Sequence, residues 1–376
     1  MQIKLTSQID PQRLNVLGLG RQELLSLISD LETQPKRAAM RVNQLWSWIY
    51  CHGISSFDKM TNIDKNLRSK LKKVFKISRL NIEKKEVSND GTTKYLFCLE
   101  DQSKIETVFI PEETRSTLCI SSQVGCTLSC SFCHTGTQKL VRNLTSQEII
   151  GQIISVYDDL GLWKKKKNEK CQSSYLDIIT NIVFMGMGEP LLNYEEVKKA
   201  CNIIMDNNGL DFSRRRITLS TAGIVPKIKM AHEEIGCMIA VSLHATEDKT
   251  RDMLVPINKK WNLKQLISTL KDDVKLRNSE RVTFEYVMLD GVNDTNDDAH
   301  RLVKLLKGLP SKINLIPFNS WTGSQYKRST ADRIKAFRDI ITKSRLPSPI
   351  RKPRGEDIMA ACGQLKSSSI KEKASI

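Results

Sequence analysis

The most informative segment of the chain is Gly125-Cys126-Thr127-Leu128-Ser129-Cys130-Ser131-Phe132-Cys133-His134. Its cysteines follow the spacing Cys-x3-Cys-x2-Cys, which ten randomly placed cysteines would produce in about one such chain in a hundred. Three thiolates on one tight loop can hold three corners of a [4Fe–4S] cluster, whose usual ligand set is four cysteines. We therefore predict that Cys126, Cys130 and Cys133 are metal ligands and that the fourth iron is open for catalysis.

A zinc ion is the alternative occupant of this loop, with His134 as a fourth ligand. A structural zinc site normally draws two ligands from a second, distant segment, and the sequence offers no second pair. The first six residues lack the apolar stretch of a secretory signal, and no apolar run approaches the roughly 20 residues that span a bilayer. We therefore expect a soluble cytoplasmic protein with no membrane partner, in which clustered cysteines serve as metal ligands or catalysts.

The composition indicates a globular protein with a polyanionic partner. The chain has 376 residues, of which 40% are apolar, and its formal net charge is +17. A nucleic acid is the simplest partner for that charge, although a lysine-rich genome would produce it too. The candidate phosphate contacts are Arg214, Arg215 and Arg216, the Lys164–Lys167 run, and Arg351, Lys352 and Arg354.

Beyond residue 110, strand-like and helix-like patterns alternate about six times. The predicted strands are Thr117–Ser121, Ile178–Met185, Arg216–Ser220, Met238–Leu243, Val282–Met288 and Ile313–Pro317. The predicted helices are Ser146–Tyr157, Tyr194–Met205, Val225–Glu233, Leu263–Leu276, Asp297–Leu306 and Ala331–Lys343. This alternation predicts an α/β fold, a partial (β/α)6 barrel whose chemistry gathers at the carboxyl ends of the strands.

Four regions follow from these patterns. Residues 1–80 carry apolar residues at helical spacing and predict a small basic helical accessory domain that binds RNA. Residues 81–110 contain the turn signal Ser88-Asn89-Asp90-Gly91 and predict a β-hairpin linker. We expect the barrel at residues 111–350 and a C-terminal segment with a functional cysteine at residues 351–376.

Polar residues stand at several predicted strand ends. Phe184-Met185-Gly186-Met187-Gly188-Glu189-Pro190 closes the second strand, where glycines let the backbone approach a ligand and Glu189 can meet an ammonium group. Ser220, Ser242 and His244 follow on the third and fourth strands, and Asn319 follows the sixth. Together these residues predict one binding site around the rim of the barrel.

With these motifs the chain resembles the radical S-adenosylmethionine superfamily, and within it the RlmN family. The likeness to RlmN rests on Cys119–Cys126, Phe184–Asn193, Ser220–Gly223 and Ala360–Leu365, and it extends over nearly the whole chain. It implies methylation of carbon 2 of adenine in 23S ribosomal RNA and in transfer RNA. It also implies that S-adenosylmethionine is bound by Gly188, Glu189, Ser220, Ser242, Leu243, His244 and Asn319.

The resemblance further implies a mechanism that uses two molecules of S-adenosylmethionine per turnover. Cys362 takes a methyl group from the first, and a radical generated from the second removes a hydrogen from that methyl group, so that its carbon adds to adenine. Cys119 then resolves the protein–RNA adduct by a transient disulfide with Cys362, and Glu106 is the candidate for proton transfer. A flavodoxin-like reductant supplies electrons, and we assume a monomer.

Three other functions remain open from the sequence. A Cfr-type enzyme would methylate carbon 8 of the same adenine, with the same cluster loop and both cysteines. A non-catalytic RNA-binding protein would carry structural zinc, and a radical enzyme with another outcome would usually show further cysteine clusters. The remaining cysteines show no ligand spacing, and we interpret them as structural: Cys51, Cys98, Cys171, Cys201 and Cys237.

Overall fold

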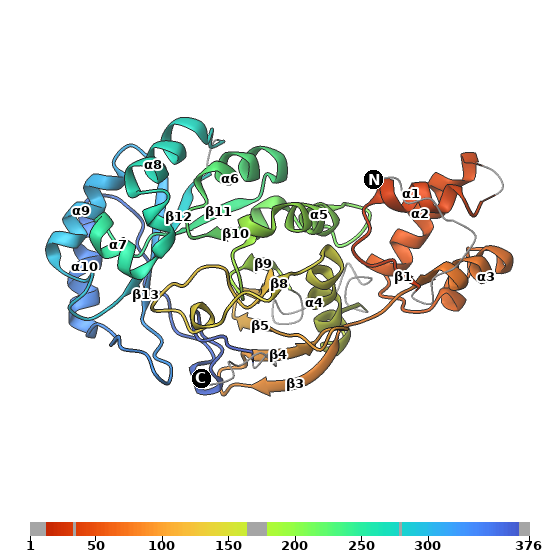
Figure 1. The fold of residues 1–376 in the computed structure, drawn as a ribbon, viewed down its shortest axis with the longest axis horizontal. Helices are drawn as coiled ribbons and strands as arrows, with labels where there is room; N and C mark the ends of the chain where they lie inside the picture. Colours follow the sequence, from red (N-terminus) through yellow and green to blue (C-terminus); the bar gives the residue numbers. More distant parts are fainter. Residues whose placement is uncertain (1–12, 33–34, 164–178, 278–279, 368–376) are drawn as a thin grey trace, which may run out of the picture.

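The computed structural model describes residues 13–32, 35–163, 179–277 and 280–367. A nine-stranded sheet forms its centre, and six neighbouring strands of this sheet run parallel. Their carboxyl ends therefore lie along one edge, as the sequence predicts, and the partial barrel is confirmed (Figure 1). In spatial order the parallel strands are β6 (Arg115–Cys119), β9 (Asn181–Phe184), β10 (Ile217–Thr221), β11 (Met238–Ser242), β12 (Val282–Met288) and β13 (Ser311–Pro317).

Three antiparallel strands continue the same sheet beyond β6. They are β5 (Lys104–Glu112), β4 (Thr93–Cys98) and β3 (Asn81–Val87). The turn at residues 88–91 joins β3 to β4, with Gly91 in the left-handed region at φ +83°. The segment predicted as a hairpin linker thus continues the barrel's sheet, and its contact with the parallel strands is the pairing of Val108–Glu112 with β6.

Helices follow the parallel strands, and their apolar faces are buried against the sheet. They are α4 (Ser146–Asp159), α5 (Tyr194–Met205), α6 (Val225–Met230), α7 (Asp248–Leu254), α8 (Leu263–Ser268), α9 (Asn296–Leu306) and α10 (Ala331–Lys343). Two predicted helices end in a π-helical turn, at Ala231–Ile235 and Thr269–Asp273. The sequence did not predict α7, because this short polar helix buries only Arg251 and Leu254.

The N-terminal helices α1 (Arg21–Ser29), α2 (Pro35–Tyr50) and α3 (Lys65–Val74) lie at one end of the elongated molecule, far from α9 and α10 (Figure 1). Arg21 joins them to the barrel through an ion pair with Asp206, at 2.5 Å, and stacks over the Trp46 ring. None of the helices in the described residues is long and apolar enough to cross a membrane.

Candidate active site

The predicted cluster loop begins directly after β7 (Gln123–Val124), at the carboxyl end of β6. Gly125 has φ +74°, and a Cβ there would come within 2.2 Å of the Lys139 carbonyl oxygen, so the loop entry requires glycine. Cys133 N donates to Cys130 O at 3.1 Å, which closes a tight turn between two of the thiols. A neighbouring residue fastens the loop to α7, because Ser131 N donates to Leu254 O at 3.1 Å.

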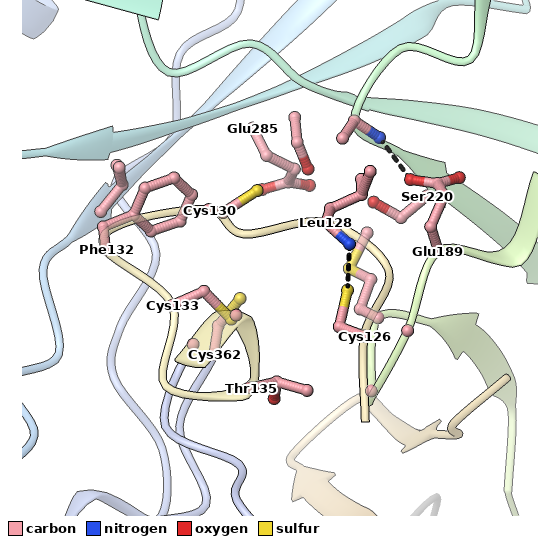
Figure 2. A pocket seen from close by; sticks show the side chains of 18 of the residues that line it. Cys126, Leu128, Cys130, Phe132, Cys133, Thr135, Glu189, Ser220, Glu285 and Cys362 are labelled. Carbon is pink, nitrogen blue, oxygen red and sulfur yellow. Dashed lines mark hydrogen bonds between the residues drawn. The ribbon is translucent and has the colours of Figure 1, made fainter. Parts of the chain in front are cut away.

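The three cysteines line one cavity together with most of the predicted rim residues (Figure 2). Burial raises the pKa of all three thiols, to about 12 for Cys126. Bound iron would reverse this effect, because a coordinating metal deprotonates its thiol ligands. The cavity has a volume of about 140 Å³, and its polar lining residues are Cys126, Cys130, Cys133, Thr135, Glu189, Ser220, Thr221, Ser242, His244, Glu285 and Cys362.

The donor set fits an iron–sulfur cluster better than a zinc ion. The His134 ring stacks on Trp321 with centroids 4.5 Å apart, and its Nδ1 lies 3.2 Å from Gln364 O. His134 is therefore engaged by neighbouring segments, while Cys126, Cys130 and Cys133 share the cavity. Within the described ranges, no three His, Cys, Asp or Glu side chains are arranged to hold a metal ion by themselves.

The segment after β9 carries a buried glutamate on the cavity wall. Glu189 Oε2 accepts a hydrogen bond from Ala222 N at 2.8 Å, and Oε1 accepts one from Leu191 N at 3.1 Å. Burial raises the pKa of this carboxyl to about 7, and a cationic ligand beside it would favour its charged form. Gly188 packs tightly beside it at φ +95°, where a Cβ would lie 2.4 Å from Gln123 Cβ.

His244 offers a neutral hydrogen-bond donor to the same cavity. Its Nδ1 accepts from Val287 N at 3.0 Å, so the imidazole proton resides on Nε2. Burial lowers its pKa to about 3, which keeps the ring neutral at physiological pH. The adjacent Leu243 is fully buried, and its N donates to Glu285 O at 3.0 Å.

Cys362 lies between this first cavity and a second cavity of about 420 Å³, and it lines both. The thiol is exposed to these cavities, although protein atoms surround it and burial raises its pKa to about 12. Hydrogen bonds fix its segment on both sides. His134 N donates to Gly363 O at 2.7 Å, and Asn319 Nδ2 donates to Cys362 O at 3.1 Å. Asn319 lines the second cavity instead of the first.

Cys119 reaches the second cavity from the end of β6. Burial raises its pKa to about 12, and the neighbouring Cys362 thiol adds to this increase. Both thiols are free, and the described residues contain no disulfide, so the disulfide predicted from the sequence is not formed in this structure.

Glu106 lies outside the residues that line either cavity. It is buried on β5, where Lys94 Nζ approaches its carboxyl to 3.6 Å and Lys366 N donates to it at 2.8 Å. Lys94 also donates to Ile358 O at 2.6 Å. In this structure Glu106 therefore holds the segment that carries Cys362, and its role in proton transfer stays a prediction.

Sequence reasoning missed two buried polar residues in the barrel interior. Glu285 on β12 lines both cavities, and its carboxyl accepts a hydrogen bond from Asn314 Nδ2 at 2.7 Å. Figure 2 shows the Glu285 side chain pointing into the pocket. The sequence signal that could have found it was a charged residue in the middle of a predicted strand. All residues of this strand are buried, and a buried charge requires a partner.

The predicted phosphate contacts lie on different segments of the fold. Arg214, Arg215 and Arg216 are exposed just before β10, and Arg351, Lys352 and Arg354 line the second cavity. The Lys164–Lys167 run and Cys171 lie outside the described residues. Of the other cysteines predicted to be structural, Cys201 and Cys237 are buried and Cys51 and Cys98 are half-buried.

Two family models match the chain. The Ribosomal RNA large subunit methyltransferase N-terminal domain matches residues 14–77, and the Radical SAM superfamily matches residues 120–306.

Similar proteins extend the match to almost the whole chain. The Dual-specificity RNA methyltransferase RlmN of Cereibacter sphaeroides is 56% identical over 361 residues, which cover 96% of this chain and 91% of that protein. The protein of the same name from Paracoccus denitrificans is 56% identical over 94% of this chain and 90% of its own. The crystal structure of a radical SAM methyltransferase from Sphaerobacter thermophilus superposes with a TM-score of 0.82 at 36% identity, covering 93% of this chain and 98% of that one.

Proposed function

Because this chain belongs to the RlmN family of radical S-adenosylmethionine RNA methyltransferases, we propose that it methylates carbon 2 of adenine in 23S ribosomal RNA and in transfer RNA. Membership makes it an enzyme that methylates RNA, and the family implies a [4Fe–4S] cluster and S-adenosylmethionine. The choice of carbon 2 and the two RNA substrates form part of the proposal.

Carbon 2 is an electron-poor aromatic carbon and cannot attack a sulfonium methyl group. The bound cluster and S-adenosylmethionine would supply the radical chemistry that this carbon needs. Cys126, Cys130 and Cys133 would hold the cluster, and Gly188, Glu189, Ser220, Ser242, Leu243 and His244 would contact S-adenosylmethionine. Glu189 suits the ammonium group of a methionine, and the His244 Nε2–H suits an acceptor oxygen or nitrogen. Asn319 would act from the side of Cys362.

Cys362 would carry the methyl carbon as a thioether. The position of its thiol between two cavities is the observation that carries this proposal. From there it can take a methyl group on the side of the cluster cysteines and present the carbon to RNA on the other side. Each turnover would use one S-adenosylmethionine for this methylation and a second for the radical. Cys119, on the wall of the second cavity, would then attack the Cys362 sulfur as a thiolate, so that the disulfide forms while the bond from this sulfur to the RNA-bound carbon breaks and the carbon leaves with the RNA.

The proposal also covers proton transfer, the electron donor, and the oligomeric state and location of the enzyme. Glu106 would take part in proton transfer once RNA is bound. A flavodoxin-like protein would deliver the electrons, and a monomer in the cytoplasm would act on both RNA classes. The target base must leave its stack to reach a thiol inside the barrel, which favours unpaired loops of the RNA.

Anaerobic reconstitution followed by nucleoside mass spectrometry tests this function. Purified protein with iron, sulfide, a reductant and S-adenosylmethionine should convert adenine of 23S ribosomal RNA and of transfer RNA to 2-methyladenine. Formation of 8-methyladenine instead would show that the enzyme methylates carbon 8 of adenine and not carbon 2. Unmodified RNA together with bound zinc in place of iron would refute the catalytic assignment.

A further inference from the structure

The second cavity lies on the far side of Cys362 from the cluster cysteines, and its walls are mostly apolar. The apolar lining residues are Val108, Ile110, Val183, Met185, Ile316, Pro317, Pro349, Ile350, Pro353, Ala360, Ala361 and Leu365. Such walls suit the two faces of a flat heteroaromatic ring. A ring of this kind also needs polar partners for its edge, and the cavity offers them deep in the barrel.

Glu285 and Asn314 form this polar pair. They are register partners on the parallel strands β12 and β13, so both side chains point to the same face of the sheet. Each residue is 6% exposed. Glu285 Oε1 accepts from Asn314 Nδ2 at 2.7 Å, while Glu285 Oε2 and Asn314 Oδ1 make no hydrogen bond with any described residue. Buried polar atoms facing a cavity indicate a ligand that completes their hydrogen bonds.

Several cationic side chains line this cavity, namely Arg115, Lys312, Arg351, Lys352 and Arg354. Burial lowers the pKa of Lys312, the Glu285 carboxyl opposes that change, and the positive charges of Arg351, Arg115 and Arg281 lower it further. The three arginines therefore lie close enough to repel Lys312. Lys312 and Arg115 stand at the amino-terminal ends of β13 and β6, Arg281 directly precedes β12, and Arg351 N donates to Leu315 O of β13 at 2.8 Å. A phosphate backbone relieves such repulsion, and phosphate contacts position a nucleic acid without reading its sequence.

We propose that Glu285 and Asn314 recognise the N1 and N6 edge of the target adenine, which enters through the second cavity. Carbon 2 of adenine is bonded to N1, and N1 is next to the carbon that bears the N6 amino group. A base that presents carbon 2 to Cys362 therefore turns this edge toward the groups beside the thiol. Glu285 is such a group, because it lines the same two cavities as Cys362. Its free oxygen would accept from N6, and the Asn314 amide can both donate and accept.

This inference rests on the proposed function and is tested with two RNA hairpins. One carries adenine at the target position, and the other carries purine, which lacks the N6 amino group. Wild-type enzyme should prefer adenine by about 10- to 100-fold in kcat/KM, the range expected for one specific polar contact to a base. Glu285→Met, which keeps the volume and removes the acceptor, should reduce this preference to about two-fold or less. Glu285→Gln, which keeps a carbonyl acceptor, should retain it.

Lys312→Ala provides the matched control from the lining of the same cavity. It should lower kcat/KM for both hairpins by the same factor and reduce the salt dependence of binding, because it removes a phosphate contact. Thermal unfolding, iron content and the affinity for S-adenosylmethionine are measured for each variant. If Glu285→Met no longer binds S-adenosylmethionine, Glu285 contacts the cofactor and not the target adenine, and the proposal is overturned.

The two possible failures are distinct. If wild-type enzyme methylates carbon 2 and Glu285→Met keeps the full preference for adenine, the recognition role of Glu285 is wrong and the proposed function stands. If wild-type enzyme forms no 2-methyladenine in any RNA, the proposed function itself is refuted.

Discussion

Arg251 supports the binding rim from behind, and its replacement by methionine should loosen the whole site. The side chain is fully buried in α7. Its guanidinium donates to Ala222 O at 2.7 Å, Leu243 O at 3.0 Å and Ser242 O at 3.1 Å. These carbonyls belong to the strand ends whose side chains line the first cavity. The described residues offer Arg251 no ion pair, although Asn258 Oδ1 accepts a further hydrogen bond at 2.8 Å.

The expected cost follows from the acceptors left behind. Arg251→Met keeps most of the buried volume but removes the donors of three main-chain carbonyls, each worth about 1–3 kcal/mol when buried without a partner. Part of this loss is offset, because the variant no longer has to bury the guanidinium charge away from water. The net loss of unfolding free energy should be about 3–5 kcal/mol, the lower part of the summed cost of three unpaired carbonyls. Arg251→Lys keeps the charge without the planar fork and should lose less.

Urea unfolding of the metal-free protein measures this loss, and calorimetric titration of the reconstituted protein measures the affinity for S-adenosylmethionine. Arg338→Met is the control, because Arg338 pairs on the surface with its neighbour Asp339 and should change stability by no more than about 0.5 kcal/mol. A loss below about 1 kcal/mol in Arg251→Met, together with unchanged affinity for S-adenosylmethionine, would refute this reasoning.

Three shorter predictions concern the same site. Burial raises the pKa of Glu189 from 4.5 to about 7, so its contribution to stability is complete below pH 4.5 and is lost as the pH rises through 7. The loss of unfolding free energy should reach about 3 kcal/mol, and thermal melts of the metal-free Glu189→Gln variant should not show it. In urea unfolding, Gly188→Ala should lower the free energy of unfolding more than Gly308→Ala does. Both glycines have positive φ, but only the Cβ added at residue 188 would meet another atom within 4 Å. Asp357→Ala removes a 2.6 Å hydrogen bond from Ser88 Oγ that anchors the C-terminal segment, so alkylation of Cys362, measured by peptide mass spectrometry, should become faster. An unchanged alkylation rate would contradict this anchoring role.

The fold was predictable because its strands are buried runs with clear ends. Val282–Met288 was predicted and found with the same bounds, since its β-branched and aromatic residues favour a strand even though Glu285 interrupts the apolar run. The helix Asp248–Leu254 was missed because its sequence is polar and short, and its stability comes from tertiary contacts that no local pattern reveals. The π-helical turns that end two predicted helices were missed for the same reason.

The site was predictable where the chemistry is local in sequence. The spacing of the cysteines at 126, 130 and 133 places them on one loop, and the structure brings them to one cavity with Ser220 and Ser242. The partnership of Glu285 with Asn314 depends on the pairing of two strands, and sequence alone does not give that register. The position of Glu106 beside Lys94 and the C-terminal segment likewise depends on long-range pairing, and its role toward the base, which the family resemblance implied, stays a prediction.

The central claim is that Cys362 carries the methyl group. The most direct test replaces Cys362 with alanine, reconstitutes the cluster anaerobically, and follows RNA methylation and S-adenosylmethionine cleavage by mass spectrometry. We expect the alanine variant to have normal iron content and to form no 2-methyladenine. Wild-type protein that has reacted with S-adenosylmethionine alone should yield, on digestion, a Cys362 peptide in which one methyl group replaces a hydrogen. Formation of 2-methyladenine by the alanine variant would contradict the methyl-carrier mechanism and leave only the radical RNA methyltransferase assignment.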